Sequence, residues 1–192
     1  MADTVSKNYT RLISPAGTGE LQYFGSGRPT IFGNWRNDIA YKNWSISLNF
    51  VYSLGYYFRR NSILYNNAFN SSLGGIPVLH ADYDRRWRTP GDEQNTQIPA
   101  LTYPAIPAAD EFYQYSSALV ERGDHIRLRD IRLSWDMPIK KEQFMWLKAC
   151  KLYAYINNVG IIWRANKQGI DPDNITGFPT PRTYAIGVQL DF

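Results

Sequence analysis

The chain has 192 residues, of which 44% are hydrophobic and 15% aromatic, so it can form a folded core and is not a disordered segment. The formal net charge at pH 7 is only +4, and the basic residues are spread among apolar ones, which argues against nucleic-acid binding. No apolar stretch approaches the roughly 20 residues of a transmembrane helix, but barrel strands bury only alternate residues and are not excluded by this measure.

The single cysteine and the N-terminus limit the possible contexts of the chain. Cys150 alone permits neither an intrachain disulfide nor a thiolate metal site, and we expect it to be a small buried or lipid-facing residue. The first seven residues contain no apolar region of a secretory signal. A membrane interpretation therefore requires the chain to be a piece of a longer protein.

Two alternating segments near the N-terminus predict a β-hairpin. Residues 33–42 alternate through Trp35, Ile39 and Tyr41, and residues 45–58 place seven apolar side chains on one face. Only Lys42 and Asn43 separate the two segments, which indicates a tight turn. A strand of about 14 residues is long for a globular protein but fits a barrel strand that extends beyond the bilayer.

A connection of about 65 residues, 59–124, follows the hairpin. It contains a cluster of side chains that could bind a sugar or a peptide by stacking and charge-assisted hydrogen bonds. The cluster consists of Arg85, Arg86 and Trp87. The alternative, which we favour, is that these side chains pack inward and tie down a long loop. Pro104 and Pro107 predict an extended backbone over residues 100–109.

The residues that most often carry catalysis or bind metals form no recognisable pattern. His80 and His125 do not have a metal-ligand spacing, and a solvated turn explains Glu121 and Asp124 better than acid–base catalysis does. Residues 171–174, Asp-Pro-Asp-Asn, resemble the start of a calcium loop but lack its glycine and distal glutamate. We therefore expect no catalytic residue, no metal site and no cofactor, and a protein that is not an enzyme.

Three further strands are predicted at residues 125–137, 147–163 and 182–192. In the first, Ile126 and Leu128 follow one parity and the later apolar residues the other, so a β-bulge is expected at Arg129-Asp130. The last strand alternates strictly and ends on Phe192. A terminal strand closed by an aromatic residue is typical of transmembrane β-barrels.

The connections between the strands alternate in length. Residues 42–43 and 138–146 form shorter turns, whereas residues 59–124 and 164–181 form long loops. Short periplasmic turns and long outer loops are usual in outer-membrane barrels, whereas a 65-residue connection is rare in a compact soluble domain. The sequence therefore predicts an all-β fold of antiparallel, up-and-down transmembrane barrel strands.

Several motifs in order make the chain resemble the C-terminal part of the SusC/RagA family of TonB-dependent outer-membrane transporters. The motifs are Arg-Pro-Thr-Ile-Phe-Gly at 28–33, Gly-Tyr-Tyr-Phe-Arg-Arg at 55–60, Arg86-Trp87 before Pro-Gly-Asp-Glu at 90–93, Glu-Arg-Gly-Asp-His-Ile-Arg-Leu-Arg-Asp-Ile at 121–131, Tyr-Ile-Asn-Asn at 155–158, Ile-Asp-Pro at 170–172 and Pro-Arg-Thr at 181–183. Their joint order and spacing carry the resemblance, which covers nearly the whole chain.

The resemblance implies a 22-stranded barrel with a plug, of which this chain supplies about five to six strands. It divides the chain into a loop or partial strand (1–30), a hairpin (31–58), a long extracellular loop (59–124) and the last three strands (125–192). Five strands cannot close a barrel, so we expect a C-terminal fragment that does not transport alone.

The resemblance also implies a location and partners. The location is the bacterial outer membrane, and the partners are outer-membrane lipid, a SusD-like surface lipoprotein, TonB–ExbB–ExbD acting through parts outside this chain, the barrel-assembly machinery, and a glycan or peptide substrate. Gly187, Leu190 and Phe192 match the family's assembly signal, although Ala185 replaces the usual polar residue. Alternation adds Arg127, Arg129 and Arg132 as candidate lumen-lining residues, and with the loop cluster they are the candidate substrate-binding residues.

A soluble β-sandwich, either a carbohydrate-binding module or a glycan-active enzyme, is the alternative. It would explain the aromatic residues and the strands, but not the very long connection or the terminal aromatic residue. A sandwich would be monomeric without detergent, whereas a barrel fragment would aggregate or need detergent.

Overall fold

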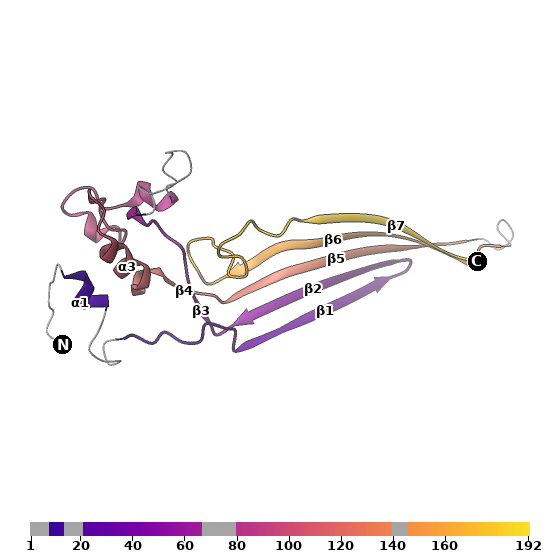
Figure 1. The fold of residues 1–192 in the computed structure, drawn as a ribbon. Helices are drawn as coiled ribbons and strands as arrows, with labels where there is room; N and C mark the ends of the chain where they lie inside the picture. Colours follow the sequence, from indigo (N-terminus) through magenta and orange to yellow (C-terminus); the bar gives the residue numbers. More distant parts are fainter. Residues whose placement is uncertain (1–7, 14–20, 67–79, 140–145) are drawn as a thin grey trace. The chain divides into compact units, whose positions relative to one another are not determined.

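The computed structural model describes residues 8–13, 21–66, 80–139 and 146–192, and the chain divides into two compact units (Figure 1). The sheet unit comprises Gly25–Phe58 and Arg122–Phe192. The insert unit comprises Met1–Phe24 and Arg59–Glu121.

Five long strands of the sheet unit form one antiparallel sheet in the order β1-β2-β5-β6-β7 (Figure 1). The strands are β1 (Ile31–Tyr41), β2 (Trp44–Leu54), β5 (His125–Met137), β6 (Ala149–Arg164) and β7 (Thr183–Asp191). Two short strands, β3 (Tyr57–Arg59) and β4 (Val120–Arg122), form a separate two-stranded sheet. The five predicted strands and their up-and-down order are confirmed. The long strands build a single sheet and not the two facing sheets of a sandwich.

The hairpin turn is where the sequence predicts it, but the second strand ends earlier. Lys42 adopts a positive φ of 52° between β1 and β2, as a tight two-residue turn requires. The strand predicted to reach residue 58 stops at Leu54, because Gly55 turns with a φ of 75°. The Gly55 N–H donates to Asp124 Oδ1 at 2.6 Å, so a residue distant in sequence satisfies the backbone where the strand ends.

A β-bulge interrupts the sheet at Arg129. Asn49 pairs with Asp130 and Phe50 pairs with Leu128, which leaves Arg129 without a partner on β2. On the other side the pairing with β6 also shifts between Leu128 and Asp130. The predicted bulge is confirmed, and it brings the apolar residues before and after it onto one face of β5.

The register gives the sheet one apolar face and one polar face, because directly paired residues point to the same side. Rows of the apolar face run Tyr41–Trp44–Trp135–Leu152–Val188 and Ile39–Ile46–Leu133–Ala154–Ile186. Rows of the polar face run Asp38–Ser47–Arg132–Tyr155–Ala185 and Arg36–Asn49–Asp130–Asn157–Thr183. The apolar face is open, and the Ile186 side chain on it is 88% exposed.

The insert unit has short helices and a small core of its own. Its elements are α1 (Tyr9–Ile13), η2 (Ala81–Arg85), η3 (Asp92–Gln94), α3 (Pro107–Tyr115) and η4 (Ser117–Leu119). The core residues are Ile63, Tyr65, Ile98, Tyr113 and Leu119. The long connection is therefore not structureless over its described residues. None of the helices in the described part of the chain has the length and apolar character needed to cross a membrane.

The extended segment predicted over residues 100–109 is wrong at its C-terminal end. Pro107 is the first residue of α3, where a missing N–H costs nothing because the first helical N–H groups have no partner within the helix. Pro107 thus begins a helix where the sequence predicts an extended backbone.

Candidate functional site

The polar face of the sheet carries a hollow of about 570 Å³. Charges of both signs line it together with hydroxyl groups, and its lining includes Arg36, Asp38, Asp130, Arg132, Lys151 and Tyr155. Such a surface suits a polar, zwitterionic partner better than an apolar one, because it offers both donors and acceptors.

A buried polar pair lies beside this hollow. Asn49 Nδ2 donates to Asp130 Oδ2 at 2.8 Å, and the two residues are only 8% and 7% exposed. Arg36 approaches the other carboxylate oxygen at 3.9 Å, which is an ion pair but too long for a hydrogen bond. The polar face is therefore an organised surface of linked side chains.

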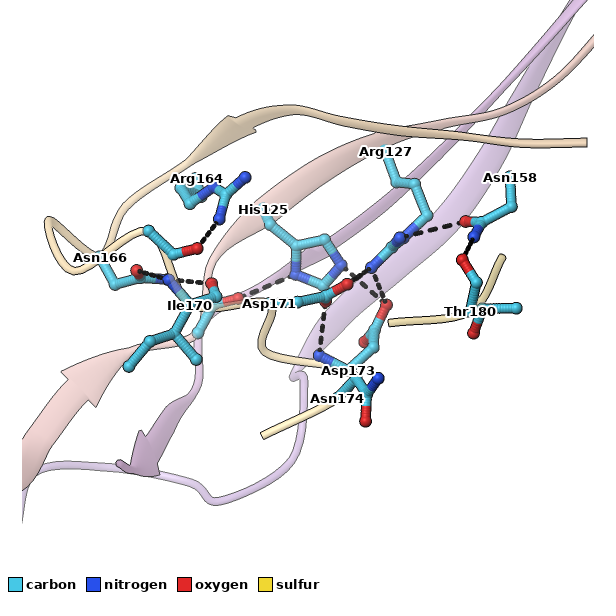
Figure 2. Close-up of polar contacts among 12 residues, drawn as sticks. His125, Arg127, Asn158, Arg164, Asn166, Ile170, Asp171, Asp173, Asn174 and Thr180 are labelled. Atoms are coloured by element: carbon cyan, nitrogen blue, oxygen red, sulfur yellow. Dashed lines mark hydrogen bonds and ion pairs between the residues drawn. The ribbon is translucent and has the colours of Figure 1, made fainter. Parts of the chain in front are cut away.

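At the other end of the sheet, Arg127 holds the segment after β6 (Figure 2). Its Nη2 atom donates to both oxygens of Asp171, at 2.6 and 2.8 Å, and to Asp173 Oδ2 at 3.1 Å. The Arg127 and Asp171 side chains are 14% and 23% exposed, so water screens this pair little, whereas the Asp173 side chain is 55% exposed. The two aspartates of the Asp-Pro-Asp sequence that resembles a calcium loop thus bind an arginine.

His125 adds a second link to the same segment and is only 1% exposed. Its Nδ1 atom lies 2.9 Å from the Gly123 carbonyl and its Nε2 atom lies 3.2 Å from Asp173 Oδ2. The hydrogen bond from His125 holds the pKa of Asp173 below its usual value, although burial opposes the shift. Burial, followed by the charge of Asp173, raises the pKa of Tyr56 to about 12.

Polar side chains of β6 and of the segment itself complete the anchoring. Asn158 has a φ of 54°, and it accepts from Arg127 Nη1 at 3.4 Å and donates to the Thr180 carbonyl. Asn166 bonds both polar backbone groups of Ile170 at 3.0 Å (Figure 2). We call the set formed by His125, Arg127, Asn158, Asp171 and Asp173 the loop anchor, because it fixes residues 165–182 on the sheet.

The three arginines predicted to line a lumen lie in different settings. Arg127 belongs to the loop anchor, Arg129 is the exposed bulge residue, and Arg132 lines the polar-face hollow. The guanidinium of Arg132 lies 5.0 Å from the Tyr153 ring centroid. Substrate binding by these residues stays a prediction, and the structure does not gather them into one site.

The predicted loop cluster makes internal contacts in the insert unit. Arg85 forms an ion pair with Asp82, and the Arg86 guanidinium lies 3.7 Å from the Tyr83 ring centroid. The Trp87 backbone N–H donates to the Ile98 carbonyl at 3.0 Å, and its indole N–H donates to the Thr89 carbonyl. Arg85 and Trp87 are exposed despite these contacts, and both inward packing and a role in substrate binding stay predictions.

Sequence reasoning missed the centre of that cluster, which is the fully buried Asp82. Its Oδ2 atom accepts from Arg60 Nη1 at 2.5 Å and from Ser62 Oγ at 2.6 Å. Burial raises its pKa, but the hydrogen bonds from Ser62, Arg60 and Arg85 outweigh burial and leave the pKa below its usual value. No spacing in the sequence indicates this pairing.

The structure also shows the surroundings of Asp124, of the possible metal ligands and of Cys150. Asp124 does not lie in a solvated turn, since it is only 3% exposed and accepts from the Gly55 N–H. No group of three metal-ligating side chains occurs among the described residues. Cys150 is buried, as expected.

The residues of the predicted assembly signal lie on and just beyond β7. Gly187 pairs with Tyr153, and Leu190 pairs with Cys150. The Phe192 ring stacks on Trp146, with centroids 5.4 Å apart and planes 11° apart. Recognition of these residues by an assembly machinery stays a prediction.

Comparisons with known proteins agree with this fold. The chain is 27% identical to TonB-dependent receptor P26 of Formosa agariphila over 191 residues, covering 91% of this chain and 18% of the receptor. The solved RagAB peptide transporter superposes with a TM-score of 0.62 and 20% identity, covering 93% of this chain and 19% of that one. The RagAB peptide importer in the open-open state gives a TM-score of 0.61 at 20% identity, over 89% of this chain and 18% of that one. No protein-family model matches the chain.

The chain thus spans about a fifth of the length of the proteins that it matches. The resemblance to a segment of a TonB-dependent transporter of the SusC/RagA type is confirmed, and the fold is an open part of such a barrel. These proteins are a receptor and peptide importers, which agrees with the expectation that the chain is not an enzyme.

Proposed function

We propose that the chain is part of the barrel wall of a TonB-dependent importer in the bacterial outer membrane. Its apolar face lies against lipid and its polar face lines the lumen. The observation that carries the proposal is the continuity of the two faces, since each apolar row crosses all five strands without a charged residue. An outward apolar band with a polar interior is the arrangement of transmembrane barrels.

The distribution of connections and aromatic side chains supports an orientation. The β1–β2 turn, the end of β5 and the end of β7 lie at one edge of the sheet, as the pairs Trp44–Trp135 and Cys150–Leu190 indicate. Trp44 and Trp135 stack there at 5.9 Å, as expected for an aromatic girdle at a membrane interface. We assign this edge to the periplasm and the edge with residues 165–182 to the cell exterior.

The transporters that the chain resembles support a proposal for its cargo and partners. The RagAB structures are of a peptide importer, and the mixed charges of the polar-face hollow suit a zwitterionic peptide better than a neutral glycan. We propose peptide uptake with a SusD-like lipoprotein, powered by TonB–ExbB–ExbD through parts of the transporter outside this chain. Uptake of labelled peptides, compared with oligosaccharides of equal mass, tests the choice of cargo in a transporter carrying this segment.

A pair of adjacent lysine substitutions tests the lipid-facing assignment. Ile186→Lys puts a charge on the apolar face, and Ala185→Lys puts the same charge on the polar face one residue away. A lysine near the bilayer midplane on the lipid side costs about 2–4 kcal/mol. Ile186 is 88% exposed in the chain, so the same lysine facing water would cost little.

The measurement is urea unfolding of the chain refolded into phospholipid vesicles, followed by tryptophan fluorescence. We expect Ile186→Lys to lower the stability or block insertion, while Ala185→Lys unfolds like the unchanged chain. Equal stability of the two variants in vesicles would contradict the proposal.

A further inference from the structure

His125 occupies a position in which both of its ring nitrogens face hydrogen-bond acceptors. The Gly123 carbonyl, 2.9 Å from Nδ1, can only accept, and so can the ionised carboxylate of Asp173, 3.2 Å from Nε2. A neutral imidazole carries one N–H and can serve only one of them, whereas an imidazolium serves both. His125 is only 1% exposed, so water does not reach its ring nitrogens, whereas the Asp173 side chain is 55% exposed.

The charges around the ring lead to the same protonation state. Arg127 binds Asp171 and Asp173 together, which leaves one negative charge uncompensated in the loop anchor. Asp124, the residue before β5, is ion-paired with Arg122. A protonated His125 therefore makes the group of His125, Arg127, Asp171 and Asp173 electrically neutral.

Two further side chains face His125. Tyr56, from the connection after β2, places its hydroxyl 3.3 Å from Nδ1, and its ring meets the imidazole edge-on. Arg164 pairs with His125 across the sheet and adds a positive charge nearby, and its guanidinium donates to the Gly169 carbonyl. Tyr56 could donate to a bare Nδ1 atom, but the Gly123 carbonyl would then lose its ring N–H donor.

We propose that His125 is a protonation-controlled latch that, as an imidazolium, ties Asp173 to the Gly123 turn and so holds residues 165–182 on the sheet. Loss of the proton removes one of the two hydrogen bonds and the charge that balances Asp173. The latch is closed at low pH and loosens as the pH rises through the range in which histidine titrates.

The opening is local, because the remaining contacts do not depend on His125. Asp171 keeps its two hydrogen bonds to Arg127, and Asn166 keeps its two bonds to Ile170. The Asp173 carboxylate keeps its 3.1 Å contact with Arg127 and loses the one with His125. The part of the segment that loosens is therefore centred on Asp173 and Asn174. Asn174 lines a hollow of about 640 Å³.

Hydrogen exchange of the full chain in detergent micelles tests the latch between pH 5.5 and 8.5. The probes are the Asp173 and Asn174 amides, which donate to the side chain and the carbonyl of Asp171, both at 3.0 Å. We expect their protection factors, corrected for intrinsic exchange, to fall about tenfold as the pH rises, which is the size of effect that the loss of one hydrogen bond to a charged group produces. The Ile170 amide, bonded to Asn166, is the internal control and should not change.

Two glutamine variants separate the latch from other pH effects. His125→Gln retains an N–H donor but cannot titrate, so the pH dependence at Asp173 and Asn174 should vanish. His80→Gln removes the other histidine of the chain and should leave the pH dependence intact. The same tenfold fall in His125→Gln as in the unchanged chain would overturn the proposal.

If His125→Gln does not fold, a measurement on the unchanged chain tests the proposal independently. Nitrogen chemical shifts of the His125 ring report two N–H groups when it is protonated and one when it is not. Loss of the ring proton should coincide with the fall in protection. Loss of the ring proton with unchanged protection at Asp173 would overturn the latch.

Discussion

Tyr153 and Gly187 pair across β6 and β7, and the tyrosine ring fills the space that a β-carbon on Gly187 would need. An aromatic side chain that covers a cross-strand glycine compensates for the missing side chain and pins the register. The same relationship recurs between Tyr52 and Gly33 across β1 and β2. Gly187, which the family resemblance assigns to an assembly signal, therefore has a packing role within the sheet.

The first prediction concerns that contact. Gly187→Ala should destabilise the β6–β7 pair by about 1–3 kcal/mol, because the added methyl group overlaps the Tyr153 ring. Denaturant unfolding measures the loss. Gly27→Ala is the control, since nothing lies within 4 Å of the added atom there. Recovery of stability in the double variant Tyr153→Ser, Gly187→Ala would identify the ring as the cause, and no recovery would contradict it.

The second prediction concerns the end of β2. Asp124→Ala should cost about 1–3 kcal/mol, because it leaves the Gly55 N–H without the acceptor that ends the strand. Asp124→Asn keeps an oxygen acceptor and should cost less. Asp136→Ala is the control, because its ion pair with Lys151 is exposed and should contribute at most about 1 kcal/mol. Equal losses for Asp124→Ala and Asp136→Ala would refute this account.

Local patterns predict the strands well and the long-range polar contacts poorly. The bounds of β5 follow from its alternation, and the change of parity at Arg129 reveals the bulge, because both depend on neighbours in sequence. The end of β2 depends on Asp124, 69 residues from Gly55, so periodicity continues past the point where the strand stops. Seen in sequence alone, Asp124 resembles an ordinary turn residue.

The same limit applies to the candidate site. The Ile-Asp-Pro motif marks Asp171 as notable, but nothing in its spacing indicates that Arg127, 44 residues away, binds it. Alternation interrupted by the bulge at Arg129 places Arg127 and Arg132 on the same face of β5, and the pattern therefore suggests the same role for both. Only tertiary structure separates a buried, ion-paired guanidinium from an exposed one.

The third prediction uses the buried carboxylate of the insert unit. The pKa of Asp82 is lowered in the folded chain, so its ionised form stabilises the unit above the ordinary pKa of about 4. That stabilisation is lost as the pH falls from about 4 through the lowered value. Trp87, the only tryptophan between residues 59 and 121, reports the transition by fluorescence.

Two variants define the origin of the acid sensitivity. Asp82→Asn should unfold this unit with less dependence on pH below 4, and it should be less stable at pH 7 because Arg60 loses its charged partner. Asp84→Asn, an exposed neighbour on the same turn, should behave like the unchanged chain. If Asp82→Asn retains the full acid sensitivity of the unchanged chain, other carboxyl groups cause the loss of stability at low pH.

The last prediction separates two arginines of β5 that alternation cannot distinguish. Arg127→Ala should destabilise the sheet unit by about 1–3 kcal/mol, because Asp171 and Asp173 lose their shared charged donor and Asp171 is only 23% exposed. Arg132→Ala should cost less than about 1 kcal/mol, since it loses mainly a cation–π contact with Tyr153 at an exposed position. Denaturant unfolding of the chain in micelles measures both.

In a full transporter carrying this segment, the same contrast separates folding from transport. Arg127→Ala should reduce the amount of assembled protein, whereas Arg132→Glu should leave assembly intact and change peptide uptake, because a charge is reversed on the proposed lumen wall. Unchanged uptake by a fully assembled Arg132→Glu variant would remove Arg132 from the transport path. A loss of assembly as large as that of Arg127→Ala would show that Arg132 acts in folding instead, because a side chain that faces a water-filled lumen tolerates a charge reversal.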